Sequence, residues 1–144
     1  MTVLFFLSLL FFPSYAQAQK ALLLFGGQDQ KVFLGCLNCN EFDRSSVCNE
    51  FGSYGSQFSR LSIWNSFGSY GSPFSPYSPW NGLAANPPVI VDKDGNSYGY
   101  FTANPSELGR TRIPALVVFL DWMGSKTRTD LSEARDFFCK VILR

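Results

Sequence analysis

Cysteine and carboxylate side chains are the groups here that could do chemistry, because the 144 residues contain no histidine. Without histidine, Ser-His-Asp and Cys-His nucleophilic arrangements are excluded, as are histidine metal sites and the usual general base near neutral pH. Three carboxylates near the middle of the chain, Glu41, Asp43 and Glu50, could supply an acid and base pair. Nothing in the sequence fixes their separation, and exposed carboxylates usually serve solubility. We therefore assign no catalytic residue and favour a protein that is not an enzyme.

The four cysteines are Cys36, Cys39, Cys48 and Cys139. An even number of cysteines in an exported chain indicates two disulfides, and four cysteines allow three pairings. A bridge from Cys139 to one of the others would close a loop of about a hundred residues and contribute on the order of 4 kcal/mol. Two alternatives are a redox pair of Cys36 and Cys39, although it lacks the helix start that lowers a thiol pKa, and a zinc ion on all four thiolates. Structural disulfides are the interpretation that we favour, with no metal and no cofactor.

The first eighteen residues predict a secretory signal peptide. Residues 4–12 form an apolar run, Pro13 breaks it, and Ala16-Gln17-Ala18 is a small-x-small cleavage site. A core strand or a membrane anchor is the alternative, but the segment is short for a membrane span. Cleavage would leave residues 19–144 as one domain without a membrane span, in the periplasm or outside the cell. The formal net charge of +1 indicates neither nucleic acid nor an anionic membrane surface as a partner.

A tandem repeat occupies residues 46–81. Residues 46–59 recur sixteen residues later as residues 62–75, with ten of sixteen positions identical between the copies, and a third copy begins at Ser78 and stops. Its glycines and serines disfavour a helix and predict turns and very short strands. Disorder is the alternative for such a composition, but the regular aromatic residues favour an ordered array. We expect Trp64, Trp80 and Cys48, which share one position of the repeat, to point into the core. The phenylalanines and tyrosines should be buried between stacked copies.

Aromatic residues of the repeat could instead bind a ligand. The candidate binding residues are Trp64, Trp80, Tyr54 and Tyr70, because aromatic faces can stack on the apolar faces of sugars, although rings at a regular period are more often core. The partners that we expect are an envelope glycan or another exported protein. The segment Asp92-Lys93-Asp94-Gly95-Asn96 imitates the start of a calcium loop, but Ser97 and Ala103 break the pattern and a hairpin turn is favoured.

The segments around the repeat predict an α+β fold. Residues 21–25 and 31–34 should pair as one hairpin, and residues 89–91 and 98–102 as another. Pro114 and Gly124 suit the two ends of one helix, with Leu116, Phe119, Leu120 and Met123 on one face. A second helix should follow Asp130, with Leu131, Ala134, Phe138 and Val141 on one face. Residues 114–142 would thus be a helical part that closes a layer of hairpins and an irregular, aromatic-rich repeat.

Several motifs together resemble a family of small exported bacterial proteins, sometimes found as a segment of proteins with a thermonuclease-like domain. They are Leu24-Phe25-Gly26-Gly27, residues 33–39, the Ser-Ile-Trp-Asn-x-Phe-Gly-x-Tyr-Gly-Ser repeats and residues 87–92. The resemblance covers nearly all of the chain after residue 18. It implies an exported bacterial protein and supplies no catalytic residues.

Three functions are compatible with these patterns. The leading hypothesis is an exported, non-catalytic domain that binds a ligand or acts as a structural accessory. The first alternative is a hydrolase or nuclease accessory that uses Glu41, Asp43 or Glu50. The second is a thiol oxidoreductase that uses Cys36 and Cys39.

Overall fold

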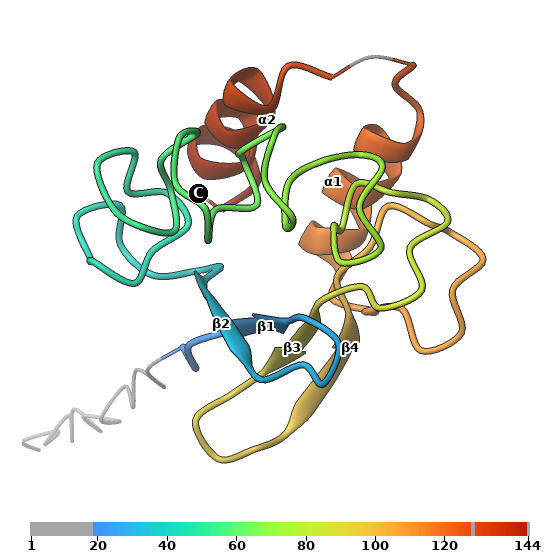
Figure 1. Ribbon diagram of the computed structural model, residues 1–144. Coiled ribbons are helices and arrows are strands. Elements are labelled where there is room, and N and C mark those ends of the chain that lie inside the picture. Colours follow the sequence, from blue (N-terminus) through green and yellow to red (C-terminus); the bar gives the residue numbers. More distant parts are fainter. Residues whose placement is uncertain (1–18, 128, 144) are drawn as a thin grey trace, which may run out of the picture.

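A four-stranded antiparallel sheet forms one end of the molecule (Figure 1). The computed structural model of this chain describes residues 19–127 and 129–143, so the expected signal peptide lies outside the described residues. The strands are β1 (Leu23–Gly26), β2 (Val32–Cys36), β3 (Val89–Val91) and β4 (Ser97–Tyr100), in the order β2-β1-β3-β4. Both predicted hairpins are present, and β1 pairs with β3 to join them across the long repeat segment.

Asp92 builds the turn between β3 and β4. Asp92 is buried, and its carboxylate accepts hydrogen bonds from the side chain and amide of Asn96, the amide of Asp94 and the hydroxyl of Tyr98. The pKa of Asp92 lies well below its ordinary value, chiefly because the Asn96 side chain donates to the charged form, while burial opposes the shift. The favoured hairpin turn is therefore confirmed. The groups that donate hydrogen bonds to the Asp92 carboxylate all belong to this turn and to the strand after it.

Two helices cover the other end of the core. Helix α1 (Pro114–Gly124) begins with proline in its first turn and buries Leu116, Phe119, Leu120 and Met123, as the sequence predicted. Helix α2 (Leu131–Phe137) begins at Asp130, whose side chain accepts a hydrogen bond from the amide of Ser132, and continues into the π-helix η1 (Phe138–Ile142). The predicted inward position of Val141 is wrong, because its side chain is 58% exposed. The wider π turn rotates the last residues away from the face that Leu131 and Ala134 define.

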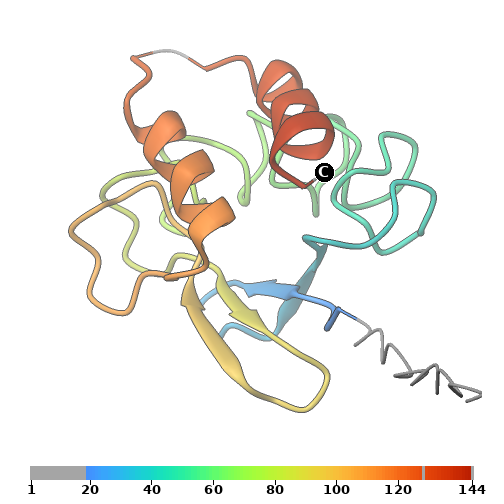
Figure 2. The same ribbon diagram turned by 180° about the vertical axis from the view of Figure 1, so that it is seen from behind.

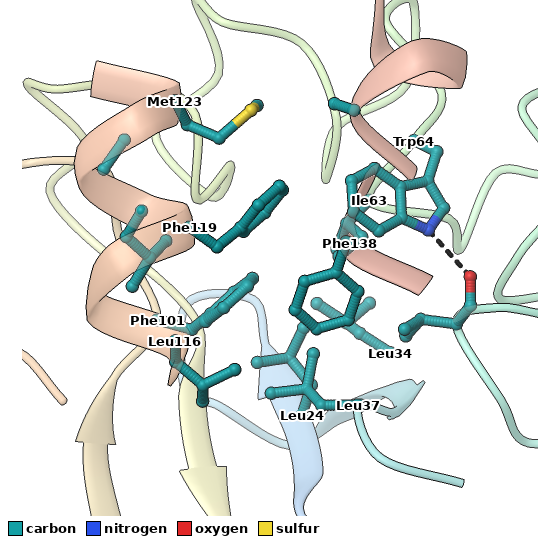
Figure 3. Close-up of a cluster of buried hydrophobic side chains, with 14 of the residues drawn as sticks. Leu24, Leu34, Leu37, Ile63, Trp64, Phe101, Leu116, Phe119, Met123 and Phe138 are labelled. Atoms are coloured by element: carbon teal, nitrogen blue, oxygen red, sulfur yellow. Dashed lines mark hydrogen bonds between the residues drawn. The ribbon is translucent and has the colours of Figure 1, made fainter. Parts of the chain in front are cut away.

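The core lies where the sheet, the helices and the repeat segment meet (Figure 3). Leu24 and Leu34 come from the sheet, Phe119 comes from α1, Phe138 from η1, and Trp64 from the repeat. The helices lie behind the repeat segment in Figure 1 and in front of it in Figure 2, so the repeat covers one side of the core. The sheet and the two helices thus form the α+β fold that the sequence predicted.

The repeat segment is a continuous series of tight turns, which we call the turn array (residues 46–84). Within one copy, five backbone carbonyls each accept a hydrogen bond from an amide further along the chain. The third of these bonds spans four residues, and the other four bonds each span three. These carbonyls belong to Ser46, Asn49, Gly52, Ser56 and Ser59, and the second copy makes the same bonds from Ser62, Asn65, Gly68, Ser72 and Ser75. Turns of this kind suit serine, asparagine and glycine, which explains the composition.

Two disulfides are present among the described residues, and one of them holds the turn array to the helical part. Cys36, the last residue of β2, bonds to Cys39, and Cys48 bonds to Cys139 across a sequence separation of 91 residues. Structural disulfides are confirmed, and the long-range bridge ties η1 to the first copy of the repeat. Among the described residues, no helix has the length and apolar character that a membrane crossing needs.

Candidate binding groove

Asparagine side chains fix the outer corners of the turn array. Asn65 donates from Nδ2 to the carbonyl of Ser59, 3.0 Å away, and its Oδ1 accepts from the amide of Phe67, 3.1 Å away. The equivalent Asn49 and Asn81 make the same pair of hydrogen bonds. Each asparagine therefore joins two neighbouring turns and holds the residue two positions later at a corner.

Phenylalanine side chains project from these corners into solvent. Phe51 and Phe67 are 91% and 98% exposed, and Phe58 and Phe74, which follow Ser56 and Ser72, are 84% and 90% exposed. The prediction that stacked copies bury these phenylalanines is wrong. A side chain at the corner of a turn points outward, away from the backbone of that turn. The residue that points into the core is therefore the tryptophan and not the phenylalanine.

The two tryptophans form a ladder inside the turn array. Trp64 is 1% exposed, its ring stacks on that of Trp80 at 5.4 Å, and its Nε1 donates to the carbonyl of Val47 (Figure 3). Trp80 repeats the bond to the carbonyl of Ile63 and is only half-buried. The ladder ends there, because the carbonyl of Pro79 accepts from the amide of Ala103 instead of from another indole.

The four candidate binding residues do not form one platform. Trp64 and Trp80 lie together on the core side of the turn array, whereas Tyr54 packs against the ring of Phe33 in β2, with centroids 4.9 Å apart. Tyr70 lies near Gly26, at the end of β1. Both tyrosines are half-buried, so they connect the turn array to the sheet. Ligand binding by these four residues stays a prediction, and Trp64 is the one member of the four that is fully buried.

Three hollows lie between residues 41–80 on one side and residues 123–127 and 129–140 on the other, and we call them together the array groove. The first hollow, about 280 Å³, lies between Phe42, Phe51 and the segment 135–140. The second, about 140 Å³, lies between Phe58, Phe67 and residues 130–132, with Trp64 at its base. The third, about 400 Å³, is lined by Phe74, Trp80, Met123, Lys126 and Leu131 among others. The second and third hollows share Ser66 and Leu131, so they adjoin each other.

Arg135 separates the first hollow from the second. Its guanidinium donates to the carbonyl of Gly55, 3.0 Å away, and lies 3.4 Å from the carboxylate of Glu50. Because Gly55 lies between the residues that line the first and second hollows, this contact also holds α2 to the turn array. Charged groups of both signs line the groove, so it has no one-sided field for a polyanion.

The three candidate carboxylates are divided between two places. Glu41 and Glu50 line the first hollow together. Asp43 is not among the residues lining that hollow, and its carboxylate accepts hydrogen bonds from the hydroxyl and amide of Ser45. The pKa of Asp43 is lowered, first by the Ser45 hydroxyl and then by the Ser45 amide, so this group serves a local turn.

The Cys36–Cys39 pair joins the last residue of β2 to the irregular segment that follows it and does not lie at a helix start. Cys36 is fully buried and Cys39 is half-buried. Low thiol pKa values in redox pairs come from a helix N-terminus or a nearby cation, and the position after β2 offers no helix N-terminus. A thiol oxidoreductase stays an untested prediction.

Sequence reasoning missed the phenylalanines of the groove and the wall that α2 supplies. The sequence did contain a pattern that predicts these corners. Four apolar residues each follow an asparagine by two positions, which is the spacing of a turn capped by an asparagine side chain. They are Phe42, Phe51, Phe67 and Leu83. The contact of α2 with the turn array carries no local signal, because it depends on the Cys48–Cys139 bridge, one of several that the sequence allowed.

Comparisons with known protein families, with curated proteins and with solved structures returned no match for this chain.

Proposed function

We propose that this chain is an exported, non-catalytic binding domain that holds an extended ligand in the array groove. The observation that carries the proposal is the set of exposed phenylalanines beside consecutive hollows. Packing of the domain does not require these rings, since they are 84% to 98% exposed in the two full copies. Exposed apolar side chains gathered along a concave surface are characteristic of binding sites. The predicted signal peptide supports export, and the two disulfides suit an oxidising compartment.

The architecture supplies a rigid support for such a groove. The backbone amides at the corners donate hydrogen bonds to asparagine or serine side chains. Trp64 and Trp80 of the tryptophan ladder line the second and third hollows, and the opposite wall is tied to the array by a disulfide. A preformed groove loses little conformational entropy when a ligand binds. This property favours a binding domain over a structural accessory that acts without a ligand.

The test is co-sedimentation of the exported, purified protein with isolated bacterial cell envelopes. The Phe67→Ser variant should bind the envelopes about tenfold more weakly, equivalent to about 1.4 kcal/mol, because it removes one wall of the second hollow. The matched control is Leu108→Ser, which removes an apolar side chain that is 89% exposed outside the groove. Absence of envelope binding, or equal binding by both variants, would contradict the proposal.

A hydrolase remains the second candidate because Glu41 and Glu50 line the same hollow at one end of the groove. Two carboxylates beside a groove can act as acid and base on a glycosidic bond. Incubation with envelope polysaccharide or with nucleic acid should then release products, and Glu41→Gln should abolish the release without loss of envelope binding. No release by the unsubstituted protein would exclude this candidate.

A further inference from the structure

We infer that the ligand of the array groove is a glycan strand, with consecutive sugar rings in the third and second hollows. This inference rests on the proposed binding function and adds the chemical class of the ligand. The third hollow, of about 400 Å³, is within the size range of small-ligand sites and can hold a complete pyranose ring. The adjoining second hollow, of about 140 Å³, can receive one face of the next ring.

The aromatic walls match one side of a sugar ring. Phe74 and Trp80 line the third hollow, and Phe58 and Phe67 line the second. Phenylalanine faces carry no hydrogen-bonding atom, so they suit the C–H faces of a pyranose and not its hydroxyl groups. Regularly repeated aromatic positions also suit a ligand that is itself a repeating chain.

The rim of the two hollows matches the hydroxyl groups of a sugar. Gln57 and Ser132 line the second hollow, Lys126 lines the third, and Ser66 lines both. These side chains offer donors and acceptors around an apolar base, which is the arrangement that an amphipathic ring requires.

An extended peptide fits the groove less well. Peptides that bind in extended form usually pair with free backbone groups of a strand edge. Along the groove, the amides of Phe58, Phe67 and Phe74 already donate hydrogen bonds to the side-chain oxygens of Ser56, Asn65 and Ser72. The opposite wall is α2 and the residues before it, which supply side chains and no strand edge. Nucleic acid fits less well too, because the whole chain has a formal charge of only +1.

Titration with purified oligosaccharides, followed by tryptophan fluorescence and calorimetry, tests the inference. The probes are peptide-free glycan strands of peptidoglycan and chito-oligosaccharides of one to six units. We expect affinity to rise at least tenfold from one to three sugar rings. Phe67→Ser and Phe74→Ser should each lower it about tenfold, because each removes a wall from one of two adjoining subsites. Leu108→Ser should leave it unchanged.

The outcomes separate this inference from the proposed function. If the protein binds envelopes through Phe67 but binds none of these glycans, the glycan inference is overturned and the ligand is an envelope protein or lipid. If glycans bind equally well to the Phe67→Ser and Phe74→Ser variants, the inferred subsites are wrong. If neither envelopes nor glycans bind, both the inference and the proposed function fail.

Discussion

The asparagines at the corners of the turn array stabilise the backbone, although they lie near the surface. Asn65 joins the carbonyl of Ser59 to the amide of Phe67 and so fixes two turns with one side chain. The side chain of Asn40, at the entrance of the array, is exposed, and among the described residues it accepts one hydrogen bond, from the amide of Phe42. The number of backbone groups that each side chain satisfies should set its contribution to stability.

Asn65→Ala should lower the free energy of unfolding by about 1–2 kcal/mol, because the amide of Phe67 loses its acceptor and the carbonyl of Ser59 keeps only its hydrogen bond from the amide of Ser62. Asn40→Ala is the control and should cost about 0.5 kcal/mol, since it removes a single exposed bond. Urea denaturation followed by tryptophan fluorescence measures both values. An Asn40→Ala loss that equals or exceeds that of Asn65→Ala would contradict this role of the asparagine.

Asp92 should make stability depend on pH. Its folded-state pKa is lowered from 3.8, so the charged carboxylate stabilises the fold above that pH. As the pH falls below about 4, the unfolded chain binds the proton more readily than the folded chain does, and stability is lost. Denaturation curves at a series of pH values should show this decline, and Asp92→Asn should flatten it while lowering stability at neutral pH. An unchanged slope in the variant would show that another group titrates.

At the scale of elements, the turn array depends on glycines where one turn closes on the next. A Cβ on Gly71 would lie 2.1 Å from the carbonyl oxygen of Asn65, and a Cβ on Gly55 would lie 2.0 Å from that of Asn49. Real Cβ atoms do not approach backbone this closely, so these turns cannot keep their shape with alanine. Gly82, in the third and incomplete copy, has no neighbouring atom within 4 Å of a built Cβ.

Gly71→Ala should therefore destabilise the protein by several kcal/mol, on the order of 3 kcal/mol or more, because the backbone of the array must move. Gly82→Ala should be neutral within about 0.5 kcal/mol, because its Cβ points into open space. Thermal unfolding by circular dichroism compares the two. Equal effects would show that the array tolerates a rearranged turn at Gly71.

The secondary-structure elements with local sequence signals could be predicted, whereas the orientation of side chains in the turn array could be predicted only in part. Strands and helices with local signals were predicted within a few residues, as at Pro114 and Gly124 of α1. The inward position of tryptophan was predicted because Trp64, Trp80 and Cys48 share one slot of the repeat. The outward phenylalanines were not, because composition alone does not tell which corner of a tight turn faces the core. Val141 was misplaced because a π turn breaks the 3.6-residue period on which the prediction depended.

For the whole molecule, the Cys48–Cys139 bridge connects the two walls of the array groove. It links the first copy to η1 across a sequence separation of 91, whereas Cys36 and Cys39 are separated by three positions. In the chain-entropy model these loops correspond to about 4–5 and about 2 kcal/mol. The Cys48→Ala/Cys139→Ala variant should therefore lose more stability and groove binding than Cys36→Ala/Cys39→Ala. Non-reducing peptide mapping and urea denaturation of both variants measure the difference, and a larger loss in the second would contradict the assigned role.

Hydrogen–deuterium exchange of the protein with and without purified peptidoglycan glycan strands is the most direct test of groove binding. Bound glycan should slow exchange within the segments 57–80 and 130–132, which contain residues that line the second and third hollows, and leave the strands β2 and β4 at the edges of the sheet unchanged. Slower exchange confined to a sheet edge, or none anywhere under conditions where the protein retains the glycan, would contradict the account.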